Sequence, residues 1–235
     1  MLLKEFIKER YYPHRTLKEV LNDDDVGNLV SVKGSYSKVY NHKTDPTLII
    51  KIGTTAQLVN DGYLNYLYRI QKMNSPFVPQ IEYIKIFEQV REDKTSTGRY
   101  IFKVCMEKLY DASDVDIAQG YALLNRYFGK FIDQDRQLKK YVQNEGNPIS
   151  LFIKLLTMII FKFDRSWMER NYTVFKQFMT AKIDDIEDQY LRKLAHLIGR
   201  QGKQFDEDLR SDNVMYRMTP YGLQPVITDP FVGKK

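Results

Sequence analysis

The sequence predicts an α+β protein with two lobes, a β-rich N-lobe followed by a mainly helical, truncated C-lobe. Residues 29–106 contain short runs of β-branched and alternating apolar residues separated by glycine and proline turns, which is typical of strands. Residues 114–200 instead repeat their apolar residues with helical spacing. Two further β-rich runs, 214–216 and 225–227, follow the helical part. Because strands and helices are segregated along the chain, we expect two lobes with a cleft between them.

The composition of the chain limits the class of protein. With 235 residues, of which 43% are hydrophobic, the chain can bury a sizeable core, and wholesale disorder is not expected. The formal net charge is +6, from 36 basic and 30 acidic residues. This modest excess favours a solvated basic surface or attraction to phosphate ligands, and direct nucleic-acid binding is not expected. The single Cys105 excludes an internal disulfide and a multi-cysteine metal site.

Residues 1–28 are predicted to form an N-terminal helical extension, with an amphipathic helix over 1–21. The apolar part of this segment is too short, and its charges come too early, for a signal peptide. The most apolar window, 149–163, is interrupted by Lys154 and Lys162 and is too short to span a bilayer, so it predicts a buried helix. We therefore expect a soluble, intracellular protein that does not associate with a membrane.

The N-lobe is predicted to span residues 29–109 and to contain five strands, with one helix inserted after the third. The strands are bounded by turn residues such as Gly34 and the pair Asp45-Pro46, and residues 91–99 form a charged loop. The expected strands are 29–32, 38–40, 47–52, 81–86 and 100–106, and the expected helix is 57–73.

The C-lobe is predicted to span residues 110–235. Asn147-Pro148 offers a helix start, because Asn caps helix N-termini and Pro is tolerated in the first turn. The expected helices are 121–131, 149–163, 172–179 and 190–198, followed by the strands 214–216 and 225–227.

A glycine turn lies between the first two predicted strands of the N-lobe. Gly34, Ser35, Tyr36 and Ser37 form this turn, and Val39 begins the return strand. Backbone N–H groups of such a turn can cover phosphates where side chains lack bulk, so this turn, which also holds the aromatic Tyr36, is a candidate for nucleotide binding. An ordinary hairpin turn is the alternative interpretation.

Lys51 lies within the third predicted strand, inside a run of aliphatic residues. A central strand rarely accepts an ammonium group without an anionic partner, so Lys51 is a candidate ligand for nucleotide phosphates. No Glu occurs between Lys51 and Glu82, which makes Asp61 the candidate carboxylate partner, with Gly62 permitting close helix packing. A lysine on an edge strand that faces water is the alternative.

The strongest pattern lies between residues 205 and 229. Four carboxylates occur within residues 205–213, and such clusters are unfavourable unless they are solvated or bound to cations. Asn213 follows Asp208 by five residues and leads into a strand, and Asp229 closes the next strand sixteen residues later. An amide oxygen and a carboxylate side by side suit magnesium, with Asp208 positioned to accept a hydroxyl proton. A solvated acidic turn is the alternative.

Together these segments resemble the protein-kinase-like fold, and most closely the early serine/threonine kinases of short-tailed, T-seven-like bacteriophages. The likeness is carried by residues 34–40, 50–53, 61–62, 208–215 and 225–230. It implies ATP and Mg²⁺ as cofactors, with transfer of the γ-phosphoryl group to Ser or Thr of host bacterial proteins, including transcription machinery. The implied location is the cytoplasm of the infected bacterium.

The resemblance also assigns roles to individual residues. It implies Asp208 and Lys51 as catalytic residues and Asn213 and Asp229 as magnesium ligands. The nucleotide would further contact the glycine turn, Asp61 and the end of the fifth strand, where backbone groups would bind adenine. That strand end comprises Met106, Glu107 and Lys108.

Two departures from the kinase pattern leave other functions open. Asp206 and Glu207 precede Asp208 in place of the usual His and Arg, so control by a phosphorylated activation loop has no basis here. Only six residues follow Asp229, so we expect no activation segment, with the helical part holding peptide substrates. The alternatives are a pseudokinase that inhibits a host protein by binding it, and a small-molecule phosphotransferase similar to aminoglycoside kinases.

Overall fold

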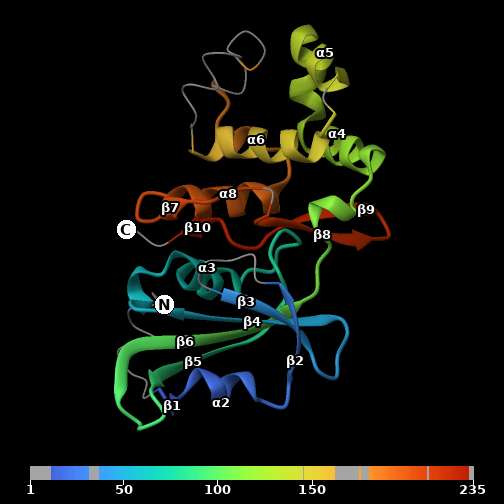
Figure 1. The fold of residues 1–235 in the computed structure, drawn as a ribbon. Coiled ribbons are helices and arrows are strands. Elements are labelled where there is room, and N and C mark those ends of the chain that lie inside the picture. The colour runs from blue at the N-terminus through green and yellow to red at the C-terminus, as the bar shows by residue number, and fades with distance from the viewer. Residues whose placement is uncertain are drawn as a thin grey trace. The chain divides into compact units, whose positions relative to one another are not determined.

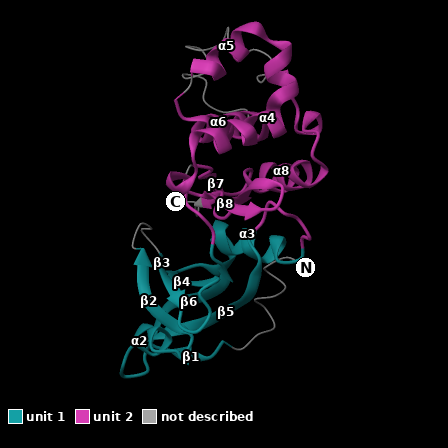
Figure 2. Cartoon of the chain, turned by 90° about the vertical axis from the view of Figure 1, so that its right-hand side faces the viewer, with its two compact units in different colours: residues 1–72, 79–108, 233–235 teal, residues 73–78, 109–232 magenta. Residues whose placement is uncertain are grey.

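The chain divides into two compact units, each of which is described by itself (Figure 2). The computed structural model describes residues 12–31, 37–144, 146–161, 175, 180–210 and 212–232. Unit 1 contains residues 1–72, 79–108 and 233–235, and unit 2 contains residues 73–78 and 109–232. The mixture of sheet and helix agrees with the predicted α+β class.

Unit 1 is built on a curled six-stranded sheet, shown in blue to green in Figure 1. Its strands are β1 (His14–Arg15), β2 (Val26–Ser31), β3 (Ser37–His42), β4 (Leu48–Thr55), β5 (Ile81–Val90) and β6 (Ser96–Glu107). They lie in the order β1-β5-β6-β4-β3-β2, and all neighbours are antiparallel except the parallel pair β1–β5. The five predicted strands are confirmed. The predicted 91–99 loop was too long, because β6 already begins at Ser96.

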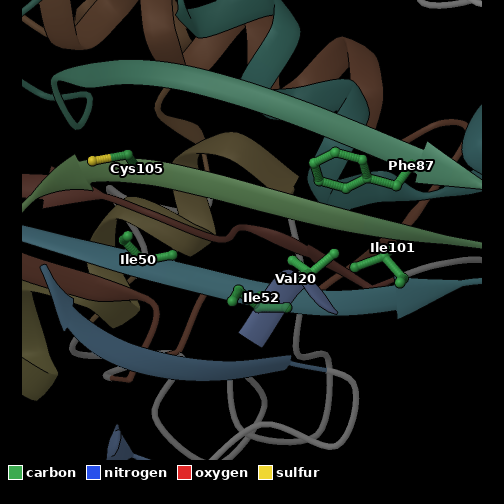
Figure 3. Close-up of a cluster of buried hydrophobic side chains, with 6 residues drawn as sticks. All are labelled: Val20, Ile50, Ile52, Phe87, Ile101 and Cys105. Carbon is green, nitrogen blue, oxygen red and sulfur yellow. The ribbon is translucent and has the colours of Figure 1, made fainter. Parts of the chain in front are cut away.

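Two helices cover opposite faces of this sheet (Figure 1). Helix α2 (Leu17–Leu21) buries Val20 against Ile50 and Ile52 of β4, in a cluster that Figure 3 shows. Lys51, between those two isoleucines, points to the other face because side chains alternate along a strand. Helix α3 (Gly62–Ile70) covers that face, within the range predicted to be helical, and is preceded by the 3₁₀ turn η1 (Leu58–Asn60).

The N-terminal segment differs from the predicted separate helix. Of residues 12–28, only 17–21 are α-helical, while His14 and Arg15 form β1; residues 1–11 lie outside the described part. Thr16 begins α2 with a capping box, because its hydroxyl accepts from the Glu19 N–H and its own N–H donates to the Glu19 carboxylate. The segment is therefore an integral part of the sheet and core of unit 1.

Unit 2 is mainly helical. Its helices are α4 (Ile117–Gln134), α5 (Arg136–Asn144), α6 (Pro148–Phe161) and α8 (Gln189–Gln201), with 3₁₀ turns η2 (Ala112–Asp114) and η3 (Ile183–Asp185). Helix α4 packs against α5 and α6, and α6 packs against α8. The predicted start at Asn147 is confirmed, since its side chain accepts from the Ser150 N–H at 2.9 Å. Helix α5 was not predicted, and the predicted helix 172–179 lies almost entirely outside the described residues.

The apolar window predicted as a buried helix forms α6, whose side chains are mostly buried. In the ranges that the structure describes, no helix combines the length and apolar character needed to cross a bilayer.

The last strands of unit 2 form two small antiparallel pairs. They are β7 (Asp206–Glu207), β8 (Val214–Thr219), β9 (Gly222–Ile227) and β10 (Phe231–Val232). The predicted hairpin is confirmed as β8–β9, with Val214 opposite Ile227 at its open end. The pairing of β7 with β10 was not predicted, and it places Glu207 opposite Phe231.

Residues 73–78 also belong to unit 2, although the sequence predicted them in the N-lobe. The reason is a set of contacts with the β8–β9 hairpin and α4. Arg217 donates to the carbonyl groups of Pro76 and Val78, and the Ile227 N–H donates to the Phe77 carbonyl. The Phe77 ring also packs edge-on against Tyr127, with ring centroids 5.4 Å apart.

Candidate functional site

The backbone around the two C-terminal strand pairs brings Asp208, Asn213 and Asp229 together. The Asp208 N–H donates at 2.8 Å to the carbonyl group of Pro230, the residue directly after Asp229. The N–H of Thr228, the residue directly before Asp229, donates to the Asn213 carbonyl at 2.9 Å. Because both chain neighbours of Asp229 are bonded to the other two residues, the three predicted residues lie side by side.

The Asp208 carboxylate is held at both of its oxygens. The Asn213 Nδ2 donates to Asp208 Oδ2 at 2.9 Å and to the Asp208 carbonyl at 2.6 Å. Arg210 Nε lies 2.5 Å from Asp208 Oδ1. Charge-assisted hydrogen bonds of this length fix the direction of a carboxylate. Asp208 therefore has one defined orientation in the loop.

The acidic residues of this loop differ in their exposure to water. Asp206 and Asp212 are exposed, so the interpretation of a solvated acidic turn holds for these two. Glu207 and Asp208 are only partly exposed, and burial followed by the charge of Asp206 raises the pKa of Glu207. A cation bound beside Asp208 would relieve this local excess of negative charge.

The donor set fits a magnesium ion. Asn213 uses its amide nitrogen on Asp208, which leaves its amide oxygen as the atom that could bind a cation. The half-buried carboxylate of Asp229 could supply a second hard oxygen of the kind that Mg²⁺ prefers. Among the described residues, no three His, Cys, Asp or Glu side chains group together as a metal site.

Lys51 and its predicted partner Asp61 lie in unit 1. Strand β4 runs between β3 and β6, so the alternative of an edge-strand lysine was wrong. Lys51 Nζ lies 3.8 Å from the centroid of the Tyr63 ring, a cation–π contact with a buried residue of α3. This fixes the ammonium group on the α3 face of the sheet.

Asp61 is the N-cap of α3, where its Oδ1 accepts from the Leu64 N–H at 2.9 Å. Burial raises the pKa of Asp61, and the Leu64 N–H, the Thr55 hydroxyl and the positive charge of Lys51 partly offset that rise. The charge of Lys51 thus favours ionisation of Asp61, while their pairing around a nucleotide stays a prediction. This carboxylate belongs to the N-cap residue of α3 and not to the middle of the helix.

The remaining predicted nucleotide contacts are only partly described. Gly34, Ser35 and Tyr36 lie outside the described residues, and Ser37 begins β3 opposite Gly53. Unit 1 also contains the end of β6, where Met106 is buried.

At that strand end the backbone N–H groups bind other parts of unit 1. The Glu107 N–H donates to the Gln80 carbonyl at 3.0 Å, and the Lys108 N–H donates to the Thr47 carbonyl at 2.7 Å. The Glu107 carboxylate in turn accepts from the Gln80 N–H at 2.8 Å. The N–H groups of Glu107 and Lys108 therefore already have partners within unit 1.

Among the residues that contact the predicted ones, sequence reasoning missed Tyr63, Arg210 and Thr228. Thr228 immediately precedes Asp229 and Arg210 lies between Asp208 and Asn213, so their positions offered a signal. The contact of Tyr63 with Lys51 depends on how α3 is rotated against the sheet, and the sequence offers no signal for that rotation.

No model of a known protein family matches the chain, and a search of curated proteins finds no significant match. The functional assignment therefore depends on the residues and geometry described above.

Proposed function

We propose that the chain is a serine/threonine protein kinase of the phage type, which transfers the ATP γ-phosphoryl group to proteins of a host bacterium. The observation that carries the proposal is the convergence of Asp208, Asn213 and Asp229 at the open ends of two strand pairs. In protein kinases an Asp followed five residues later by an Asn, and then a second Asp, supply the base and the metal ligands.

Each residue has a role that follows from its chemistry. Asp208 orients the acceptor hydroxyl and accepts its proton, and Asn213 would hold its carboxylate in place during that step. Asn213 and Asp229 would hold Mg²⁺, which when bound neutralises charge on the nucleotide phosphates. Lys51 binds phosphate oxygens with its ammonium group.

The strand order of unit 1 supports this role for Lys51. In protein kinases the phosphate-binding lysine lies on a strand that follows the glycine loop and pairs with an acid from the next helix. Lys51 likewise lies on β4, which follows the β2–β3 hairpin, and Asp61 caps the next helix, α3. The shorter acid at the helix cap, where kinases have Glu, is a departure.

Substrates and location follow from the resemblance alone. The proposed substrates are host bacterial proteins, the transcription machinery among them, and the proposed location is the cytoplasm of the infected bacterium. Direct nucleic-acid binding is not part of the proposal.

One contact favours a second candidate, a pseudokinase that binds a host protein without phosphoryl transfer. Arg210 Nε lies 2.5 Å from Asp208 Oδ1 and so occupies an oxygen that would accept the hydroxyl proton. Because Arg210 is two-thirds exposed, its side chain can leave when substrate binds, and we therefore prefer the active kinase.

The test is phosphoryl transfer from labelled ATP, with Mg²⁺, to proteins of a bacterial lysate. We expect labelled bands from the wild type and a loss of at least about 100-fold in Asp208→Asn and Asp229→Asn. Asp212→Asn, which alters an exposed carboxylate of the same loop, should keep the activity and serves as the matched control.

Three outcomes separate the candidates. Bands that survive both Asp208→Asn and Asp229→Asn would overturn the kinase assignment. Thermal stabilisation by ATP and Mg²⁺ without any transfer would support the pseudokinase. Transfer to small cationic metabolites but not to proteins would support a small-molecule phosphotransferase.

A further inference from the structure

Thr228 makes two hydrogen bonds to a single acceptor, the carbonyl group of Asn213. Its N–H donates at 2.9 Å and its Oγ1 donates at 3.1 Å. Thr228 lies between the end of β9 and Asp229, and Asn213 lies directly before β8. The two hydrogen bonds therefore join the chain segments that carry the two proposed metal ligands.

These bonds extend the β8–β9 hairpin beyond its last regular pair, Val214 and Ile227. Past this pair, the bonds of Thr228 join the two segments directly, and the bond from the Asp208 N–H to the Pro230 carbonyl joins them one residue beyond Asp229. Because the Asn213 side chain is also bonded to Asp208, a rotation of the Asn213 backbone would move both the amide oxygen and the Asp208 carboxylate. Thr228 thus acts on Asn213 through its main chain.

The hydroxyl group is the feature that distinguishes threonine here. Any residue except proline could supply the N–H at position 228, but valine, which has the same shape, would lose the second hydrogen bond. Serine would keep that bond while losing only a methyl group. The pair of substitutions therefore separates the hydroxyl from the packing of the side chain.

We propose that Thr228 is a positioning residue, whose hydroxyl group sets the separation of the Asn213 amide oxygen and the Asp229 carboxylate to suit one Mg²⁺ ion. The proposal rests on the proposed function, because it assigns Asn213 and Asp229 as the magnesium ligands. Thr228 itself contacts neither metal nor nucleotide in this role.

The experiment compares Thr228→Val, Thr228→Ser and the control Thr219→Val. At the turn end of the same hairpin, Thr219 Oγ1 donates to the Gly222 carbonyl at 2.7 Å and accepts from the Tyr221 N–H at 3.2 Å, so the control loses hydroxyl bonds away from the metal ligands. Mn²⁺ binding in the presence of a non-hydrolysable ATP analogue is measured by electron paramagnetic resonance. The Mg²⁺ concentration for half-maximal transfer is measured in parallel, as is the melting temperature without metal.

We expect Thr228→Val to weaken Mn²⁺ binding and raise the half-maximal Mg²⁺ concentration by about 3- to 10-fold, the effect of one neutral hydrogen bond. Thr228→Ser should restore both values, and Thr219→Val should leave both unchanged. Unchanged metal affinity in Thr228→Val, no rescue by serine, or an equal effect of Thr219→Val would overturn the positioning role.

If Thr228→Val also lowers the metal-free melting temperature, Thr228→Ala must show the same weakened metal binding relative to Thr228→Ser; otherwise the positioning role is overturned. A wild type that binds neither nucleotide nor Mn²⁺ would overturn the proposed function itself. Wild-type binding with an unaffected Thr228→Val would overturn only the role of Thr228.

Discussion

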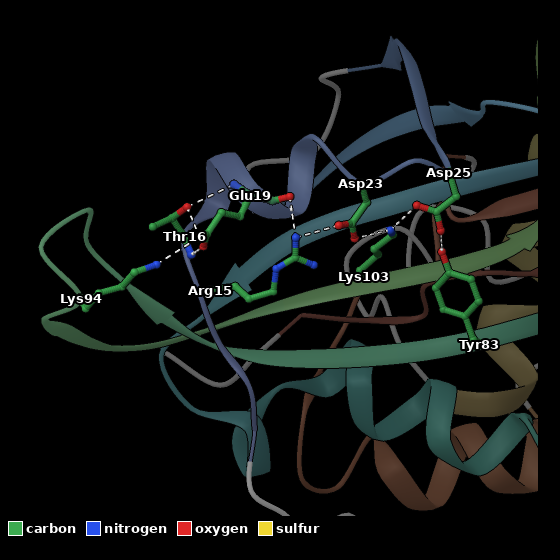
Figure 4. Close-up of polar contacts among 8 residues, drawn as sticks. All are labelled: Arg15, Thr16, Glu19, Asp23, Asp25, Tyr83, Lys94 and Lys103. Atoms are coloured by element: carbon green, nitrogen blue, oxygen red, sulfur yellow. Dashed lines mark hydrogen bonds and ion pairs between the residues drawn. The ribbon is translucent and has the colours of Figure 1, made fainter.

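Lys103 Nζ lies 2.7 Å from Asp23 Oδ2, although the Lys103 side chain is only 1% exposed. The same ammonium group donates to Asp25, and the Tyr83 hydroxyl donates to the second oxygen of Asp25 (Figure 4). Arg15 holds the far oxygen of Asp23 at 2.7 Å. A buried ammonium group requires such partners, because its desolvation is otherwise strongly unfavourable. The network ties the turn after α2 to the middle of β6.

The first prediction concerns the loss of this buried cation. Lys103→Met leaves Asp23 and Asp25 without their shared partner, and we expect the free energy of unfolding of unit 1 to fall by about 3 kcal/mol. Urea unfolding with hydrogen exchange of the β6 amides measures it. Lys94→Met is the control, because the Lys94–Glu19 pair is exposed on both sides and its loss should leave stability unchanged. Equal effects of the two substitutions would contradict the prediction.

The second prediction is a loss of stability in acid. Burial opposes ionisation of Asp23 and Asp25, but hydrogen bonds from Arg15 and Lys103 to Asp23, and from Lys103 and Tyr83 to Asp25, outweigh it and lower both pKa values from 3.8. The unfolded chain then binds more protons than the folded chain at low pH.

The stabilisation from these carboxylates should therefore be complete well above pH 3.8 and decline as the pH falls through the lower folded-state pKa values. Thermal unfolding of unit 1 between neutral and acid pH measures the decline. The double substitution of Asp23→Asn and Asp25→Asn should flatten this dependence. A wild-type profile as flat as that of the double variant would refute the assignment.

The third prediction separates stability from nucleotide binding at Asp61. Because burial raises the pKa of Asp61, the folded chain binds a proton more tightly there, and the contribution of Asp61 to stability falls as pH rises above 3.8. Asn can replace Asp as an N-cap. We therefore expect Asp61→Asn to be at least as stable at neutral pH while losing the electrostatic contact with Lys51 and binding ATP more weakly.

Calorimetric titration with ATP and Mg²⁺ measures that loss, and a melting curve measures stability. Asp188→Asn is the matched control, because Asp188 caps α8 through the Tyr190 and Leu191 N–H groups and is not among the predicted nucleotide contacts. Unaltered ATP affinity in Asp61→Asn would exclude Asp61 as the functional partner of Lys51.

The fourth prediction compares two glycines with opposite expected effects. Gly222 begins β9 with a φ of +98°, and a Cβ there would lie 3.1 Å from the Arg126 guanidinium. Gly222→Ala should destabilise unit 2 by more than about 1 kcal/mol, since alanine is strained at positive φ. Gly129 lies inside α4 with no atom within 4 Å of an added Cβ, so Gly129→Ala should stabilise by about 0.5–1 kcal/mol. Melting curves of both variants measure these effects, and melting temperatures that shift in the same direction would contradict the prediction.

The β-rich first part, the helix after its third strand and the β8–β9 hairpin could be predicted from the printed residues. Alternating apolar runs and turn residues act between near neighbours, so they report local structure directly. The same holds for Asp208 and Asn213, which one loop of five residues brings into contact. The position of Asp229 close to Asn213 could also be predicted, because a tight hairpin returns the chain to its starting point.

Contacts between distant parts of the chain could not be predicted in this way. Asp23 and Lys103 are 80 residues apart, and neither has a neighbouring residue that indicates the other. The parallel pairing of β1 with β5 and the packing of residues 73–78 in unit 2 likewise depend on partners far away in the chain. Such contacts form because packing of the whole unit brings buried charges and unpaired backbone groups together, and no local pattern encodes that outcome.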